Sequence, residues 1–116
     1  MALTGIDLSN LSVLRYLNVD HNQLGSLDVS DASALQQLSA IDTNLSYIDL
    51  SHNPLLTSLS LADNHLAELD ISHNTDLWNL NASNNELYTL TVSGAAQVYH
   101  TGATFTLDSN ALCSGT

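Results

Sequence analysis

Basic residues are almost missing from this chain. Arg15 is the only lysine or arginine among 116 residues, against 12 acidic residues and a formal net charge of −11. Nucleic acid is disfavoured as a partner, because phosphate binding needs a lysine or arginine footprint. An anionic membrane surface is disfavoured for the same reason. No stretch approaches the ~18 consecutive apolar residues of a membrane span, so no membrane insertion is expected.

Cysteine and charge are scarce as well. Cys113 is the only cysteine, so no disulfide can form within the chain. The thiol is either free, a link to another chain, or half of a pair lost by truncation. Charged residues make up 11% of the chain, well below the usual quarter. No charged-then-apolar segment precedes the first repeat, so any export signal is absent or already removed.

Leucine recurs at a constant interval, at Leu3, Leu24, Leu45, Leu66 and Leu87. From each leucine, apolar residues follow at the third and fifth positions, and a second L-x-x-L-x-L half begins midway to the next leucine. The second halves begin at Leu14, Leu35, Leu56 and Leu77, with Val98, Thr101 and Ala103 as the fifth. L-x-L alternation predicts a short strand with one side inward. Only stacked units can bury such apolar rows.

The pattern therefore predicts a leucine-rich-repeat solenoid. Parallel strands stack at one 21-residue unit per turn, and the chain is mostly β and loop with little helix. Residues 1–103 hold five units, with starts near 3, 24, 45, 66 and 87, and residues 104–116 form a C-terminal strand, tail or cap. Thr104 to Leu107 reads as one more strand. Each unit has either two strand-like faces or one strand face and one irregular face.

An asparagine often follows the last apolar position of a half-unit by three residues. The set is Asn22, Asn53, Asn64, Asn74 and Asn85, with Thr43 at the same place in the second unit. Buried turn backbone needs hydrogen-bond partners, and an inward asparagine can supply them to its own and the next unit. These residues are predicted to form a structural asparagine ladder rather than a ligand site.

Four aspartates form an outward column: Asp7, Asp28, Asp49 and Asp70. Like charges at strand spacing repel one another. The result is solvated or hydrogen-bonded carboxylates, raised pKa values, or a bound cation such as Ca²⁺ on Asp28, Asp49 and Asp70. The first outcome is favoured, because the aspartate belongs to the repeat pattern itself. His52 and His73 also stack, but their column offers no tight tetrahedral ligand set, so neither a metal nor a cofactor is expected.

Serine, histidine and aspartate are all present, but each belongs to a repeated column. No nucleophile elbow or other catalytic motif accompanies them. A catalytic site needs a singular, concave arrangement of groups, which a repeating surface does not provide. The chain is therefore not expected to be an enzyme.

Residues that break the repeat are better candidates for ligand contacts. They lie in two neighbouring columns and comprise Arg15, Tyr16, Trp78, Asn79, Tyr99 and His100. A surface tryptophan beside tyrosine, asparagine and histidine is typical of a protein or sugar contact. Equally open is that Trp78 and Tyr99 cover each other on a flank.

The units at residues 45–65 (LSYIDLSHNPLLTSLSLADNH) and 66–86 (LAELDISHNTDLWNLNASNNE) resemble the 21-residue leucine-rich repeats of bacterial proteins. The internalin J-like adhesins and many secreted or surface proteins of Bacteroidetes carry similar repeats. The resemblance covers about residues 3–103. It implies a secreted or cell-surface module that binds a protein or glycan. One departure is clear: the cysteine ladder of the internalin J-like repeats is replaced by Val19, Ala40, Leu61, Ala82 and Ala103.

The repeat is already in phase at Leu3, with only Met1 and Ala2 before it. An uncapped solenoid exposes apolar side chains and an unpaired strand edge. Either the chain is a fragment of something longer, or another copy covers the open end head to tail, which without a closing rotation gives a filament. The leading functional hypothesis is thus an adhesion module. The alternatives are a subunit of a self-assembling extracellular filament and, more weakly, an intracellular effector domain.

Overall fold

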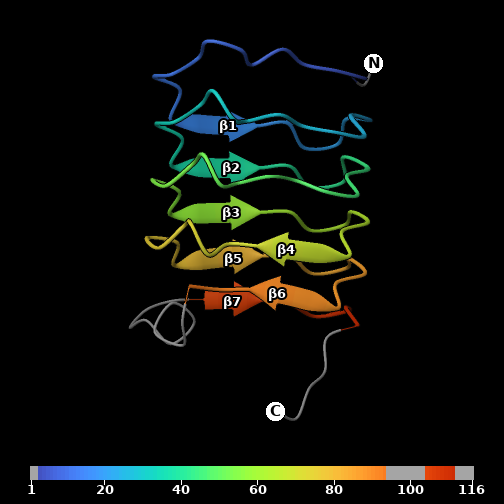
Figure 1. Ribbon diagram of the computed structural model, residues 1–116. Coiled ribbons are helices and arrows are strands. Elements are labelled where there is room, and N and C mark those ends of the chain that lie inside the picture. The colour runs from blue at the N-terminus through green and yellow to red at the C-terminus, as the bar shows by residue number, and fades with distance from the viewer. Residues whose placement is uncertain (1–2, 94–103, 112–116) are drawn as a thin grey trace.

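The computed structural model describes residues 3–93 and 104–111, and there the chain winds into a stack of similar units (Figure 1). Its elements are seven short strands, namely β1 (Tyr16–Asn18), β2 (Gln37–Ser39), β3 (Ser58–Ser60), β4 (Glu68–Asp70), β5 (Asn79–Asn81), β6 (Thr89–Thr91) and β7 (Thr104–Thr106). The described segments hold no helix, and so none that is long and apolar enough to cross a membrane. The predicted parallel-strand solenoid is confirmed.

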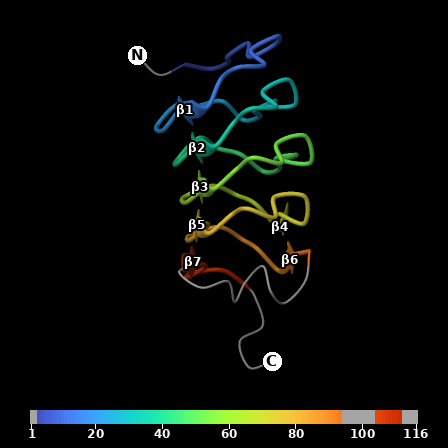
Figure 2. The same ribbon diagram turned by 90° about the vertical axis from the view of Figure 1, so that its left-hand side faces the viewer.

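One side of the stack is a five-stranded parallel sheet in the order β1-β2-β3-β5-β7. Its register follows the repeat, because Leu17 pairs with Leu38 and Leu38 with Leu59, one repeat further along the chain each time. The opposite side is strand only in β4 and β6, which pair in parallel. Figure 2 shows the two sides edge-on, with the strands of the five-stranded sheet on the left and β4 and β6 on the right. The structure thus lies between the two predicted forms, with one complete strand face and one partly irregular face.

The core is the row of apolar side chains enclosed between the two sides. Leu59 and Leu80 reach in from the sheet with 1% and 0% of their surface exposed, and Leu69 and Ile71 reach in from the other side with 2% and 0%. Burial of each such side chain contributes about 1.5–3 kcal/mol. Where the resembling repeats carry cysteines, Val19, Ala40, Leu61 and Ala82 are at most 4% exposed. Apolar packing therefore fills the place of the cysteine ladder.

The corner that follows each strand of the five-stranded sheet uses a left-handed residue. The column of His21, Asp42, Asp63, Asn84 and Ser109 has φ between 57° and 62°. Asparagine, aspartate and histidine are enriched among non-glycine residues in this conformation, and short polar side chains tolerate it best. The abundance of Asn and Asp between the apolar positions is therefore partly a requirement of the sharp corner.

The last unit departs from the regular repeat spacing. Strand β5 pairs with β7 so that Phe105 lies beside Leu80, in the place that the repeat interval assigns to Thr101. The prediction that Thr101 would take that place is wrong, and Val98, Thr101 and Ala103 lie outside the described residues. Phe105 and Leu107 pack against the core instead. The prediction of a further strand from Thr104 is confirmed by β7.

Candidate binding surface

The predicted ladder asparagines point inward and hydrogen-bond to backbone of neighbouring units. Asn64 is the most complete case. Its Oδ1 accepts from the backbone N–H groups of Thr43 and Leu45, both at 3.0 Å. Its Nδ2 donates to the carbonyls of Ala40 at 2.8 Å and Leu61 at 2.9 Å. Because Asn64 is only 4% exposed, this amide is committed to the fold and is not available to a ligand.

The remaining ladder positions act on two different corners. Asn22 and Asn85 accept from the N–H of Leu3 and Leu66, in the manner of Asn64. Asn53 and Asn74 sit at the other corner, where their amides donate to carbonyls of the preceding unit. Sequence analysis missed Asn110, whose Oδ1 accepts from Leu87 N–H at 3.0 Å. The signal was present, since Asn110 follows Leu107 by three residues as Asn85 follows Ala82.

The outward aspartates are held by their own serines. The Oδ1 of Asp70 accepts from the hydroxyl of Ser72 at 2.6 Å and from its backbone N–H at 2.9 Å, and the other three units repeat this arrangement. The hydroxyl bond, and then the backbone bond, hold the pKa of the Asp70 carboxyl below its usual 3.8. The possibility of raised pKa values is therefore wrong, because local hydrogen bonds outweigh the repulsion along the column.

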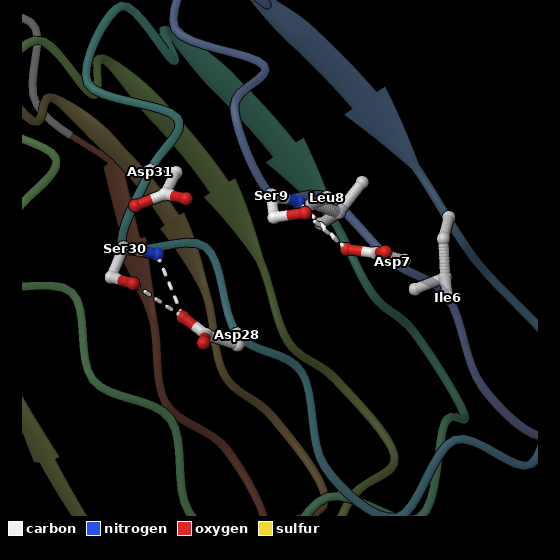
Figure 3. A pocket seen from close by; sticks show the side chains of 7 residues that line it. All are labelled: Ile6, Asp7, Leu8, Ser9, Asp28, Ser30 and Asp31. Atoms are coloured by element: carbon white, nitrogen blue, oxygen red, sulfur yellow. Dashed lines mark hydrogen bonds between the residues drawn. The ribbon is translucent and has the colours of Figure 1, made fainter.

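A shallow pocket of about 260 Å³ opens between the first two units beside these aspartates. Figure 3 shows that Asp7 and Asp28 turn toward Ser9 and Ser30. The Oδ2 of Asp31 instead accepts from the backbone N–H of Asn10 at 3.1 Å. Among the described residues, no group of three His, Cys, Asp or Glu side chains is arranged to hold a metal ion. Nothing beyond the column itself supports the cation reading of Asp28, Asp49 and Asp70.

The four histidines among the described residues, His21, His52, His65 and His73, are all exposed. His52 Nδ1 lies 3.2 Å from the hydroxyl of Ser51. His65 Nδ1 lies 3.0 Å from the carboxylate of Glu86, an exposed contact between neighbouring units. His21 makes the equivalent kind of contact with Asp42 at 3.2 Å. Each pair joins the same repeat position in two successive units, but the residue type at that position changes from unit to unit, so sequence analysis did not single the pairs out.

The outward face of the five-stranded sheet differs from the rest of the surface in its charge. Its ten described outward positions are Tyr16, Asn18, Gln37, Ser39, Ser58, Ser60, Asn79, Asn81, Thr104 and Thr106. None of the ten side chains is ionisable near neutral pH. The opposite side carries the four aspartates and Glu68. Charge is thus separated between the two sides of the stack.

A shallow groove of about 290 Å³ crosses β1, β2 and β3 on this uncharged face. Its lining comprises the larger polar or aromatic residues Tyr16, Asn18 and Gln37, the serines Ser39, Ser58 and Ser60, and the leucines Leu17 and Leu38. The Tyr16 ring is 61% exposed. The groove therefore combines an accessible aromatic surface with amide and hydroxyl groups.

The structure splits the predicted ligand-binding residues into two groups. Arg15 and Tyr16 lie at β1, and Trp78 and Asn79 lie at β5, three units further along the sheet. At ~4.8 Å per strand, the groups are about 14 Å apart. Tyr99 and His100 lie outside the described residues. The expectation that His100 continues the Asn79 column is wrong, because Thr104 pairs with Asn79.

Further apolar side chains lie on the flank that precedes the five-stranded sheet. Trp78 is 46% exposed, Leu55 in the preceding unit 45%, and Val13 in the first unit 84%. Leu55 and Val13 lie close before the Trp78 position of the repeat. On this flank, sequence analysis identified Trp78 but missed Leu55 and Val13. A single exposed Leu or Val cannot be distinguished from the buried ones in a leucine-rich pattern.

Comparison with known proteins agrees with this geometry. The Leucine Rich Repeat family model matches residues 44–79. A solved structure described as the functional domain of InlJ from Listeria monocytogenes, which includes a cysteine ladder, is similar at 33% identity and a TM-score of 0.59. The match covers 75% of this chain and 24% of that one, so the chain spans about a quarter of its relative. The comparison with curated proteins gives no match. The family match and this likeness together support a bacterial leucine-rich-repeat family for the chain.

Proposed function

We propose that the chain is a non-catalytic adhesion module that recognises a protein or glycan outside the cell. The observation that carries the proposal is the uncharged sheet face, which has the exposed Tyr16 on its first strand and the exposed Trp78 on the flank directly before β5. Tyr16 is 61% exposed and Trp78 46% exposed, and polar side chains from β2 and β3 lie between them. Exposed aromatic anchors surrounded by amides and hydroxyls are typical of recognition surfaces.

The Ser–His–Asp contacts of the chain support binding rather than catalysis. The hydroxyl of Ser51 donates to Asp49 at 2.7 Å, and the Nδ1 of His52 lies 3.2 Å from that Ser51 hydroxyl oxygen. A nucleophilic serine would instead give its proton to the histidine, and the aspartate would orient that histidine. The next unit repeats the arrangement at Ser72 and His73, again on the surface. These groups therefore act as repeated turn caps in our proposal.

An extracellular location is part of the proposal and rests on two supports. The first is the likeness to the InlJ domain of Listeria monocytogenes. The second is the shortage of basic residues, with one in 116. The role of residues 104–116 as a cap for units in residues 1–103 stays a prediction.

The test is a printed panel of cell-surface proteins, glycoproteins and glycans, probed with labelled native chain and with Trp78→Ala. Truncation of an anchoring aromatic removes about 2 kcal/mol or more of binding, which raises Kd about 30-fold. Tyr47→Ala is the matched control, because Tyr47 is 63% exposed and lies on the opposite side. Equal losses in both variants, or no bound partner at all, would contradict the proposal.

A second function, assembly of copies into a head-to-tail filament, is favoured by the exposed end of the described stack. Leu3 and Ile6 are 49% and 39% exposed, whereas Leu24 and Leu27 at the same positions of the next unit are 7% and 8% exposed. A further unit or a second copy seated on this end would bury them. Light scattering and negative-stain microscopy at moderate salt would show long uniform fibres if copies stack, and fibres should disappear in Leu3→Asp. A discrete monomer would rule out this function.

A further inference from the structure

We propose that the groove over β1, β2 and β3 binds a neutral oligosaccharide, which runs along the stack from Tyr16 toward Trp78. The proposal rests on the binding function proposed above and names the ligand class of the same surface. Three features of the groove carry it, namely an exposed aromatic ring, paired donors and acceptors, and the lack of charge, and a fourth is the spacing between Tyr16 and Trp78 on the flank.

The first feature is the ring of Tyr16. It is 61% exposed and lines the groove at β1. An aromatic side chain offers an apolar face together with a polar tip. A sugar ring has a complementary form, with an apolar C–H face and hydroxyls at its edge. Stacking of one sugar unit on Tyr16 would bury apolar surface on both partners and leave the sugar hydroxyls directed at the neighbouring strands.

The second feature is the kind of hydrogen-bonding group beyond Tyr16. Gln37 contributes two N–H donors and a carbonyl acceptor, and each serine hydroxyl both donates and accepts. The hydroxyl of Ser39 donates to the carboxylate of Asp20 at 2.7 Å, so its oxygen is left to accept. Ser58 accepts a long 3.5 Å contact from the amide of Asn79, so its own proton remains to be donated. A sugar hydroxyl can donate to the Ser39 oxygen and accept from the Ser58 hydroxyl, because hydroxyl groups do both.

The third feature is charge, which selects neutral sugars. No described side chain that lines the groove is ionisable near neutral pH. The acidic group next to the groove is Asp20, through its bond to Ser39. Arg15 precedes Tyr16, but it is a single cation in a chain of net charge −11. Sialylated or sulfated sugars would therefore be repelled, whereas a cationic ligand would find the carboxylates on the opposite side of the stack.

The fourth feature is the distance between the two exposed aromatics. Tyr16 is at β1 and Trp78 directly precedes β5, three strands away, and these two strands are about 14 Å apart. A single sugar unit cannot reach both. The affinity should therefore rise with oligosaccharide length until the chain spans Tyr16 to Trp78, and then level off.

A sugar suits this groove better than a protein anchor does. Its volume of about 290 Å³ lies at the lower limit of small-ligand sites, and among the described residues Tyr16 is its only aromatic lining residue. Protein hot spots need a well-packed apolar pocket that excludes water. A shallow polar groove instead favours weak contacts, which become strong when several sites engage one polymer.

The test is calorimetric titration with oligomers of glucose, N-acetylglucosamine and mannose of two to six units, with heparin and polysialic acid as acidic comparators. Tyr16→Ala removes the stacking surface, and Ser58→Arg fills the groove. Tyr47→Ala and Ser26→Arg make the same changes on the opposite side, where Ser26 and Tyr47 line another depression. All four positions lie outside the buried core, so each variant is expected to fold.

The expected result is binding of at least one neutral series, with an affinity that increases with length and changes little with salt. Tyr16→Ala should raise Kd about tenfold, Ser58→Arg should abolish binding, and the two controls should stay within about twofold of the native chain. Preference for the acidic comparators, or equal losses in the controls, would overturn the proposal. If no sugar binds but the protein panel still gives a partner lost in Trp78→Ala, the ligand class is wrong and the binding function stands. If neither binds, both fail.

Discussion

Replacement of Asn64 by alanine tests the internal ladder most sharply. The side chain is 4% exposed and joins two units through its amide. It accepts hydrogen bonds from Thr43 N–H and Leu45 N–H at 3.0 Å and donates to carbonyls of Ala40, Leu61 and Ala62 at 2.8 to 3.2 Å. Alanine would leave these backbone groups without a partner in a region that water does not reach.

The expected loss is large on the scale of a small domain. Each buried polar group left without a partner costs about 1–3 kcal/mol. Two donors and at least one acceptor are affected, so Asn64→Ala should lower the free energy of unfolding by about 3–5 kcal/mol if part of the strain relaxes. Total stabilities of single domains are about 5–15 kcal/mol. Asn64→Thr should cost less, because Thr43 occupies the same ladder position and its hydroxyl donates to Ala40 O.

The assay is urea unfolding followed by far-ultraviolet circular dichroism, with Asn79→Ala as a control. Asn79 is only partly buried and makes a 3.5 Å contact with Ser58, so its loss should stay within about 0.5 kcal/mol. Asn53→Ala should fall between the two, because its amide donates to two carbonyls while its Oδ1 accepts no hydrogen bond. A loss in Asn64→Ala no larger than that of Asn79→Ala would refute the reasoning.

Three other outcomes follow from the packing and the hydrogen bonds. Leu59→Ala, at a side chain 1% exposed, should cost about 2–5 kcal/mol in the same assay, and a loss below about 1 kcal/mol would mean that the core is looser than described. Ser72→Ala should return the pKa of the Asp70 carboxyl toward 3.8 in an NMR titration, because the hydroxyl and N–H of Ser72 lower it. Because the pKa of Asp70 is lower in the folded chain than in the unfolded chain, its carboxylate stabilises the fold at pH values above the unfolded pKa. This stabilisation is lost as the pH falls through the folded pKa. Acid unfolding should therefore depend less on pH in Ser72→Ala, and an unchanged Asp70 titration would contradict the assignment. Phe105→Ala should destabilise the last unit by about 2–4 kcal/mol while Thr104→Ala has little effect, and equal effects would argue against the register of β7.

The sequence predicts the stack well because the repeat is a physical requirement of the fold. An L-x-L segment has one inward position in every two, and the position can be buried only by the same residue of a neighbouring unit. Leu38, Leu59 and Leu80 therefore pair at the spacing read from the sequence. The strand content of the opposite side was less predictable, because its residues have the same apolar pattern whether or not backbone hydrogen bonds form between the units.

Strict periodicity also caused the main error. Counting one repeat length on from Leu80 led to Thr101, although Phe105, Leu107 and Asn110 form a better apolar and ladder signature slightly later in the chain. An insertion in a loop changes the spacing without changing the packing, so the residue types were a better guide than the count. The residue types also identified exposed aromatics correctly, since Tyr16 on β1 and Trp78 directly before β5 are both exposed. Their separation could not be predicted from residue type, because it depends on the number of strands between them.

The central claim is that the uncharged sheet face is the recognition surface. It is tested most directly by NMR of the isotope-labelled chain titrated with the tightest binder from the panel of proteins and glycans. The account predicts that amide shifts change along β1, β2, β3 and β5 and around Trp78, while β4 and β6 stay unchanged. Shifts confined to β4, β6 and the aspartate column that includes Asp49 would contradict it and would move the binding surface to the opposite side of the solenoid.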